Sequence, residues 1–452
     1  MNIPLFLALF SGLTLFYFLL GTIASKNIHS TTDYFLAGRN LGFFMVTFTL
    51  IATQLGGGML LGTSQDAYKM GLFGILYTVG ITLGFLALSC GLASRLQSLN
   101  VETTAQLFET RYNSIALRKI ASLLSILTLC GLLIGQVVAS RTVMSGLEIS
   151  NEYFFLGFWF FIIAYTMIGG LKAVVVTDLF QVLFIILIFG GIFIYALIRD
   201  PNSLFSLIPS TQQHNFALQT ITASSMLVTI LMPALFSLIE QDLAQRFFAA
   251  RSKKIAALSA LSASIFMIIF ALIPIYFGIQ ARMLNLPLAD GASPLIPLLT
   301  FLTNEFVVAL ALCAIIAAIT STADSLLCAV SSNIAQDFDF SFIGIHNKLH
   351  LSRILTLSTG LVALIGSYFV PQNVICVLIG SYEISVVCLL IPLVISYFKP
   401  DLNKNAAFGA VFCGFAGFIV FRIAPLAYLP KECAALMLSA LGYFCGTLVR
   451  SN

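Results

Sequence analysis

An amide side chain and three consecutive glycines interrupt a long apolar run between residues 42 and 64. The interruption reads Gln54, Leu55, Gly56, Gly57 and Gly58. Each glycine costs a helix about 1 kcal/mol relative to alanine, and a helix that opens inside a bilayer must find other partners for its backbone groups. We therefore expect Gln54 and the three glycines to face a bound polar ligand. The alternative for Gln54 is a hydrogen bond between helices, worth about 1 kcal/mol.

A second group of oxygens lies in the apolar run 304–335. Ser321 and Thr322 follow Ala318 by three and four residues, so their hydroxyls and the Ala318 carbonyl share one helix face. A sodium ion needs several oxygens, which broken-helix transporters supply from helical hydroxyls and unwound carbonyls. The alternative is that Thr322 bonds back to the Ala318 carbonyl, a common habit of Thr in membrane helices.

Four acidic residues raise a further question, because a carboxylate at membrane depth costs about 2.5 kcal/mol or more and is a functional candidate. Asp324 lies directly after the hydroxyls, and Glu240 follows Pro233. Asp178 stands near the start of an apolar run, where a hydrated helix end is the alternative. Glu383 lies deeper in its run and either lines a cavity or pairs with a neighbouring polar group.

Composition places these residues in a membrane protein. Apolar residues make up 59% of the 452-residue chain, charged residues 9%, and the mean hydropathy is +1.02. Such a chain could not maintain a soluble surface. The cysteines lack metal-ligand spacing, no basic cluster suggests nucleic acid, and the histidines lie in loops without a nucleophile or phosphate-loop motif. We expect no catalysis, no metal beyond sodium and no organic cofactor.

The apolar runs predict an all-α protein with about thirteen membrane-spanning helices, because roughly 20 apolar residues cross the hydrocarbon core. The runs fall near residues 3–24, 42–64, 71–94, 119–147, 153–169, 173–198, 222–245, 255–280, 304–335, 352–370, 374–397, 406–424 and 433–449. No stretch remains for a sizeable soluble domain.

The basic residues predict the orientation of these helices. With the N-terminus outside, 16 of the 22 lysines and arginines fall in cytoplasmic segments and 6 in external ones. Lysine and arginine favour cytoplasmic loops. We therefore expect an integral protein of the plasma (inner) membrane, with its N-terminus outside and its C-terminus in the cytoplasm.

Two interruptions suggest an internal repeat. The second predicted span contains the glycines, and the seventh contains Met232, Pro233 and Ala234. Broken helices at matching positions of two halves indicate an inverted repeat with a binding site at the breaks. We therefore divide the single domain 1–452 into a first repeat 42–198 and an inverted second repeat 222–397. Residues 1–41 and 398–452 are expected at the periphery.

Several motifs together resemble the sodium:solute symporter family, whose members carry proline, pantothenate, glucose, sialic acid or choline. They are the segment from Asp33 to Arg39, Gly169-Gly170 followed by Thr177-Asp178 and Gln181, Gln245-Arg246, and Ser321-Thr322. The resemblance implies a leucine-transporter-like fold of five plus five inverted helices. It also implies a sodium site formed by Ala52, Leu55, Ala318, Ser321 and Thr322.

Some family members resemble a second-sodium pattern that would fall on Asp178, Ser321, Asp324 and Ser325. Here Asp324 departs from the serine found in that pattern. The resemblance thus leaves the second site open.

The expected function is sodium-coupled symport of a small organic solute by alternating access, in contact with the lipid bilayer. Glycines 56–58, residues 321–325 and the stretch 408–423 look like the high-affinity choline branch, which has tryptophan in place of Gln54, whereas proline carriers have an acid there. Choline-like and proline-like solutes therefore both stay open. The solute contacts expected are Gln54, Gly56, Gly57, Gly58, Glu240 and Glu383. The alternative is a membrane sensor that works with a separate signalling partner; oligomeric state is not predicted.

Overall fold

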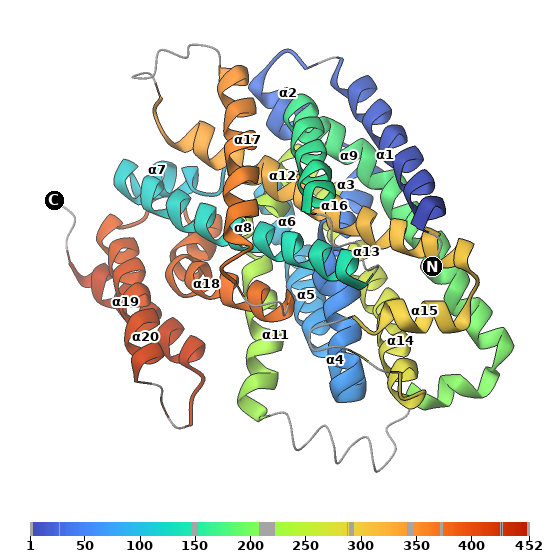
Figure 1. Ribbon diagram of the computed structural model, residues 1–452. Coiled ribbons are helices and arrows are strands. Elements are labelled where there is room, and N and C mark those ends of the chain that lie inside the picture. The colour runs from blue at the N-terminus through green and yellow to red at the C-terminus, as the bar shows by residue number, and fades with distance from the viewer. Residues whose placement is uncertain are drawn as a thin grey trace.

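Every regular element among the described residues is a helix in this computed structural model (Figure 1). One isolated bridge pairs Leu41 with Ala250. The all-α class is therefore confirmed for the described part of the chain. The structure describes residues 3–26, 28–146, 152–207, 222–286, 288, 293–340, 348–370, 374–424, 426 and 428–449.

The first half contains helices α1 (Ile3–Ser25), α2 (Thr31–Leu36), η1 (Ala37–Arg39), α3 (Phe43–Gln54), η2 (Gly58–Gly62), α4 (Thr63–Met70), η3 (Gly71–Ile75), α5 (Leu76–Ala87), η4 (Leu88–Leu92), α6 (Ala93–Ser98), α7 (Gln106–Tyr112), α8 (Ile115–Gly146), α9 (Glu152–Arg199) and η5 (Pro201–Leu207). The second half contains α11 (Ala223–Ser237), α12 (Gln241–Ala249), α13 (Lys253–Phe270), α14 (Leu272–Met283), α15 (Leu295–Leu302), α16 (Glu305–Asp337), α17 (Lys348–Gly366), α18 (Val374–Phe398), α19 (Lys404–Ile423) and α20 (Lys431–Leu448).

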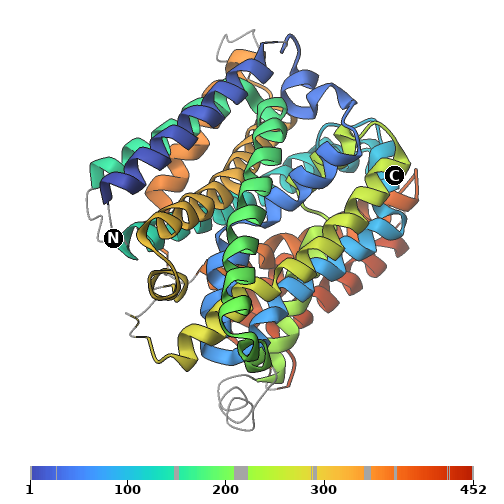
Figure 2. The ribbon, with the colours of Figure 1, turned by 90° about the vertical axis from the view of Figure 1, so that its right-hand side faces the viewer.

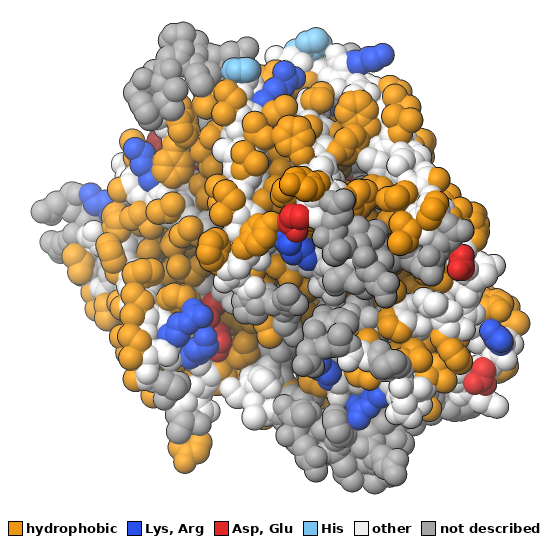
Figure 3. Space-filling model, viewed as in Figure 1, with side chains coloured by type: hydrophobic (Ala, Val, Ile, Leu, Met, Phe, Trp, Pro, Cys, Tyr) orange, Lys and Arg blue, Asp and Glu red, His pale blue; other side chains and the backbone are white. Residues whose placement is uncertain are grey.

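Ten helices of the described chain are long and apolar enough to cross a membrane. Hydrophobic side chains also cover most of the described surface in Figure 3, and charged ones are few. The chain is therefore an integral membrane protein. Thirteen spans stay a prediction. Gly170 is not helical and divides α9 at a kink, where the sequence separates two spans, and α3 is too short to count alone.

Helix α16 lies at the centre of the molecule, and 83% of its most apolar 18-residue stretch is buried. It packs against α8, α9, α17, α1 and α3. Figure 2 shows α1 lying along α9 on the outer side of this group. At the other edge, α19 and α20 form a hairpin that packs on α18 (Figure 1). The hydroxyl and acidic residues of α16 thus lie where several helices meet.

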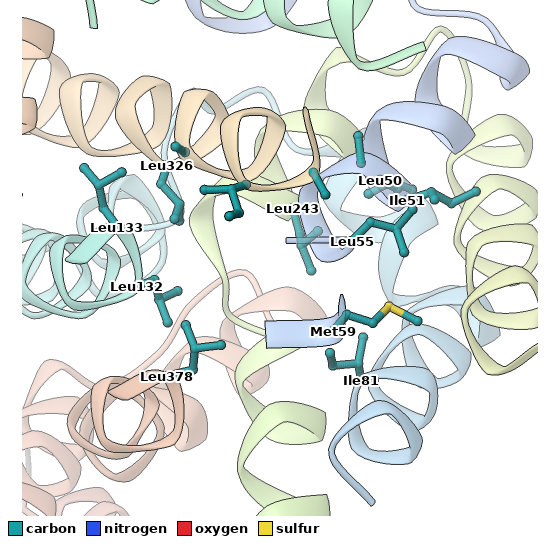
Figure 4. Close-up of a cluster of buried hydrophobic side chains, with 14 of the residues drawn as sticks. Leu50, Ile51, Leu55, Met59, Ile81, Leu132, Leu133, Leu243, Leu326 and Leu378 are labelled. Carbon is teal, nitrogen blue, oxygen red and sulfur yellow. The ribbon is translucent and has the colours of Figure 1, made fainter. Parts of the chain in front are cut away.

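The glycine-rich interruption opens the chain between α3 and η2. Helix α3 ends at Gln54, and the wide helical turn η2 begins only at Gly58. Leu55 and Met59 pack into a buried apolar cluster that also contains Ile81, Leu326 and Leu378 (Figure 4). Apolar side chains therefore pack around the backbone opening.

Gly56 explains why this opening needs a glycine. A Cβ atom at this position would lie 2.5 Å from the Thr322 hydroxyl of α16 and 2.9 Å from the Gln136 amide oxygen of α8. No side chain fits at such distances, so the glycine allows the backbone to approach both helices closely. The opened chain is thereby held against α16.

The second interruption lies further along the chain than the sequence predicts. Pro233 stands inside α11, which continues to Ser237, and the chain is extended at Glu240 before α12 begins at Gln241. Pro233 removes one backbone donor, which neighbouring groups in a membrane protein can compensate. The predicted break at Met232-Pro233-Ala234 was therefore placed too early, and Glu240 itself occupies the opening.

The motif that starts at Asp33 forms a corner against α9. The Ser30 hydroxyl and the Asp33 carboxylate cap α2 reciprocally, and the hydrogen bond from Ser30 lowers the pKa of Asp33. The Tyr34 hydroxyl donates to the Met167 carbonyl at 3.1 Å. Gly170 has a positive φ of 51°, and a Cβ there would lie 2.5 Å from the Tyr34 carbonyl oxygen. These motif residues therefore fix the corner on the bend of α9.

Candidate functional site

The predicted sodium oxygens of α3 and α16 lie together in the structure. Ser321 Oγ lies 2.9 Å from the Ala318 carbonyl and 3.1 Å from the Ala52 carbonyl. Thr322 Oγ1 lies 3.3 Å from each of these carbonyls and 2.9 Å from that of Thr53. The back-bond from Thr322 to Ala318 is thus present, but it forms together with contacts to the end of α3.

This oxygen cluster suits a small hard cation. Its members are buried, and they comprise the carbonyls of Ala52, Thr53 and Ala318 and two hydroxyls, which can rotate so that their lone pairs face an ion. Helix α3 ends two residues beyond Ala52, so its last carbonyls are not all used within the helix. Leu55 caps the end of α3 and is fully buried, but its proposed carbonyl contact to sodium stays a prediction.

A cavity adjoins the oxygen cluster at the two chain interruptions. Residues from α3, α5, α8, α16 and α18 surround it together with the segment between α11 and α12. The lining residues are Thr53, Gln54, Gly56, Gly58, Met59, Tyr77, Leu132, Gln136, Glu240, Asp242, Thr322, Leu326, Leu378 and Tyr382. Thr322 belongs to both sets, so the cluster and the cavity are adjacent.

The cavity carries an acidic pair. Gln54 Nε2 donates to Glu240 Oε2 at 3.3 Å, and Asp242 lies two residues beyond Glu240. No lysine or arginine occurs among the described residues that line the cavity. Arg246 is not among the lining residues, and its NH1 donates to the Asp242 backbone carbonyl at 2.7 Å. A positively charged group would therefore be attracted into the cavity.

Two further polar contacts shape the cavity wall. The Tyr77 and Tyr382 hydroxyls lie 2.8 Å apart, joining α5 to α18. The Gly57 backbone N–H donates to Gln136 Oε1 at 2.9 Å, and a Cβ on Gly57 would meet Ala139 at 2.4 Å. Gly57 therefore packs on α8 and does not line the cavity, whereas Gly56 and Gly58 do.

Glu383 does not belong to the cavity, contrary to the expectation from sequence. Its Oε2 accepts a hydrogen bond from Lys431 Nζ of α20 at 3.1 Å and lies 3.9 Å from Arg422 of α19. Consecutive residues of a helix point about 100° apart, so Tyr382 faces the cavity while Glu383 faces the hairpin. The pairing that the sequence left as an alternative is the one observed.

The residues of the second-sodium pattern separate into three places. Ser321 lies in the Ala52 cluster. Asp178 and Ser325 both approach NH2 of Arg246, which is fully buried. Asp324 instead lies against α9, where Thr166 Oγ1 donates to its Oδ1 at 2.6 Å. The pattern therefore does not converge on one point.

Several cavity residues escaped the sequence analysis. Tyr77 and Tyr382 count as apolar in a membrane helix, and nothing in their spacing marks them. Asp242 follows Glu240 by two residues, so the acidic pair was a readable signal. Gln136 is an isolated amide in an apolar run, like Gln54, and the same reasoning would have selected it.

These features define an all-helical membrane protein with a polar cavity at two chain interruptions, which is typical of secondary transporters. The family model described as SSF, the sodium:solute symporter family, matches residues 34–414. The chain belongs to the sodium:solute symporter family.

Individual relatives agree with this assignment. Sodium/proline symporter 2 of Staphylococcus saprophyticus is 26% identical over 405 residues, which cover 85% of this chain and 79% of that protein. The high-affinity proline transporter PutP of Bacillus subtilis is 25% identical over 366 residues, 77% of each chain. A solved structure of a Na⁺-coupled sialic acid symporter in a substrate-bound outward-open state superposes with a TM-score of 0.80, 16% identity and 98% coverage of both chains. At 16% identity, this structural similarity shows that the two chains share a fold.

Proposed function

We propose that this protein is a sodium-coupled symporter that imports a small organic solute by alternating access. The observation that carries the proposal is the approach of Ser321 and Thr322 to the Ala52 carbonyl at the end of α3. Sodium bound by Ala52, Leu55, Ala318, Ser321 and Thr322 would join α3 to α16 beside the cavity. Because Thr322 lines both sites, binding of the ion and binding of the solute are coupled.

The solute carries a positively charged nitrogen. Glu240 and Asp242 line the cavity with no basic side chain among the lining residues described, and Gln54 orients Glu240. Relatives named as proline symporters favour a proline-like amino acid. Choline is the second candidate, because Tyr77 and Tyr382 provide aromatic faces for a quaternary ammonium group.

The architecture fits two inverted repeats, 42–198 and 222–397, within the single domain. Each repeat contains one interruption, at residues 55–57 and at residues 238–240, and both interruptions reach the same cavity. This arrangement is the one in which a pair of broken helices forms a transport site. Residues 1–41 and 398–452 then add peripheral helices in the plasma (inner) membrane.

Uptake into proteoliposomes tests the proposal. Radiolabelled L-proline, choline, betaine and pantothenate are each offered with an inward sodium gradient, with equal sodium on both sides, and with potassium replacing sodium. We expect L-proline or choline to accumulate only with the sodium gradient. Equal uptake in potassium would contradict sodium coupling, and gradient-driven uptake of pantothenate alone would contradict the cationic solute.

A further inference from the structure

A second cavity lies beside α1, apart from the cavity at the two chain interruptions. Side chains of α1, of α9 on both sides of Gly170, and of the first half of α16 line it. It contains about 410 Å³ of unfilled space, and an apolar cavity of about 150 Å³ is enough to hold benzene. None of the described residues that line this cavity also lines the first one. A ligand bound beside α1 would therefore occupy a site of its own.

Aromatic rings form much of the wall of this cavity. Phe10 and Tyr17 come from α1, whereas Phe158, Phe161 and Tyr165 come from α9. The rings of Phe10 and Phe158 lie 5.6 Å apart with an angle of 55° between their planes, so they join the two helices. Aromatic rings pack favourably against a further ring in offset or edge-to-face arrangements. The wall therefore suits a ligand that contains an aromatic ring.

Two buried polar atoms in the same wall have no partner among the described residues. They are Gln181 Oε1 and the Tyr165 hydroxyl, and the two residues are 1% and 6% exposed. The orientation of the Gln181 amide follows from Thr320, whose hydroxyl donates its one hydrogen to the Ala317 carbonyl at 3.0 Å and therefore accepts from Gln181 Nε2 at 3.2 Å. Unpaired polar atoms are costly inside a bilayer. Gln181 Oε1 needs a donor and the Tyr165 hydroxyl needs an acceptor, and a hydroxyl group on a ligand offers both.

The wall carries no formal charge in the part of the chain that the structure describes. No aspartate, glutamate, histidine, lysine or arginine is among the described lining residues. An ionised ligand would lose its hydration here without gaining a counter-ion. The cavity at the chain interruptions is opposite in character, because Glu240 and Asp242 line it. A ligand that fits beside α1 is therefore uncharged.

We infer that this cavity is a binding site for an uncharged aromatic alcohol that enters from the bilayer. The ring of the alcohol packs among the aromatic side chains, and its hydroxyl donates to Gln181 Oε1 and accepts from the Tyr165 hydroxyl. Helix α1 lies on the outer side of the helices around α16 (Figure 2), and only 11% of its most apolar stretch is buried. A bound alcohol contacts α1, α9 and α16 together, so it links a peripheral helix to the helix that carries Ser321 and Thr322.

Quenching of tryptophan fluorescence in proteoliposomes tests this inference. Trp159 is the only tryptophan of the chain, it is 1% exposed, and its ring lies 5.9 Å from the ring of Phe158 in the cavity wall. Bromine quenches tryptophan at short range. The probe is 4-bromobenzyl alcohol, and the matched compound is 4-bromotoluene, which lacks only the hydroxyl oxygen. We expect the alcohol to quench in a saturable manner and to reach half its effect at a concentration in the bilayer about 2- to 10-fold lower than 4-bromotoluene needs.

Two variants remove the proposed polar contacts one at a time. Tyr165→Phe removes a single hydroxyl, and Gln181→Leu removes the amide. Each should raise the half-maximal concentration of 4-bromobenzyl alcohol about 2- to 10-fold. Tyr195→Phe, which changes a half-exposed residue of the same helix, is the matched control and should leave this concentration unchanged. If Gln181→Leu does not fold, Tyr165→Phe still decides.

Three outcomes would overturn the inference. Quenching that does not saturate, or that is equal for the alcohol and 4-bromotoluene, would mean that the probes only dissolve in the bilayer. An unchanged half-maximal concentration in the variants would remove the assigned contacts. Saturable quenching by the 4-bromobenzylammonium ion would contradict an uncharged ligand. Because the test needs neither sodium nor a transported solute, its failure would leave the proposed function intact, and failure of sodium-coupled uptake would leave this site intact.

Discussion

Thr322 belongs both to the proposed sodium cluster and to the lining of the cavity that we propose for the solute, so its hydroxyl is a direct test of the proposal. In Thr322→Ala the proposed sodium ion loses one oxygen ligand. A contact of this kind to a charged group is worth about 1.5 kcal/mol or more, so we expect the apparent sodium affinity to fall about tenfold. Ser321→Ala should act in the same direction. The measurement is the sodium concentration for half-maximal L-proline uptake.

Ser331 provides the control for these variants. It lies about two and a half turns beyond Thr322 along α16, is fully buried, and donates to the Cys328 carbonyl of its own helix. Ser331→Ala should leave the half-maximal sodium concentration unchanged. An unchanged value in Thr322→Ala and Ser321→Ala as well would show that the Ala52 cluster does not bind the coupling ion.

Glu240 distinguishes solute recognition from sodium binding. The variant Glu240→Gln keeps the size of the side chain and removes its negative charge. A charge-assisted hydrogen bond is worth about 1.5–3 kcal/mol, so we expect the KM for L-proline to rise about 10- to 100-fold while the apparent sodium affinity changes little. Glu383→Gln is the matched control, because Glu383 pairs with Lys431 outside the cavity. Equal effects of the two variants would contradict the acidic pocket.

The sequence could predict which of these side chains lie together only where their spacing along one helix determines it. Residues 318, 321 and 322 share a helix face wherever the helix lies, so their grouping followed from periodicity alone. Which face Glu383 or Asp324 presents depends on how α18 and α16 are rotated against their neighbours. That rotation results from packing over the whole chain, and one sequence does not contain it in readable form. The pairing of Arg246 with Asp178 was missed for the same reason.

At the scale of elements, the bend of α9 depends on Gly170. Its φ of 51° is unfavourable for any residue with a Cβ, and the Tyr34 carbonyl oxygen lies 2.5 Å from where that Cβ would stand. With ψ at −157°, this backbone conformation is almost restricted to glycine, and for another residue it costs about 1–3 kcal/mol. We expect Gly170→Ala to lower the Tm of the purified protein clearly. Gly190→Ala on the same helix, where nothing lies within 4 Å, should leave the Tm unchanged or slightly raised.

Element boundaries were predictable where glycine was the cause. Three glycines after Gln54 weaken a helix by themselves, and α3 ends there. Pro233 is a weaker signal, because α11 accommodates it and opens only after Ser237. Gly169 and Gly170 suggested a boundary between two spans, and α9 consists of two helical segments that meet at a kink at the non-helical Gly170. The sequence thus predicted a helix end where several glycines follow one another. Where a helix can accommodate a proline, the position of its end depends on tertiary contacts.

For the molecule as a whole, the charge asymmetry predicts its orientation. Green fluorescent protein fused to the C-terminus should fluoresce, because this end is expected in the cytoplasm. Alkaline phosphatase inserted at Tyr428, which is fully exposed between α19 and α20, should be active because that loop is expected outside. A fusion that does not fluoresce, together with an inactive insertion, would show that the orientation is the opposite of the expected one.

The number of coupled sodium ions sets the limit of accumulation. One charge crossing 100 mV provides about 2.3 kcal/mol, and a tenfold sodium gradient adds about 1.4 kcal/mol. One sodium ion therefore supports about 400-fold accumulation of a zwitterion such as proline, and two ions would support about 10⁵-fold. Because the Ala52 cluster is the one sodium site that we propose, we expect L-proline uptake by proteoliposomes under these gradients to stop near the lower limit. The measurement is the steady-state ratio of internal to external L-proline, with the membrane potential clamped by a potassium gradient and valinomycin. A plateau well above a thousandfold would require more than one sodium ion per solute and would contradict this coupling.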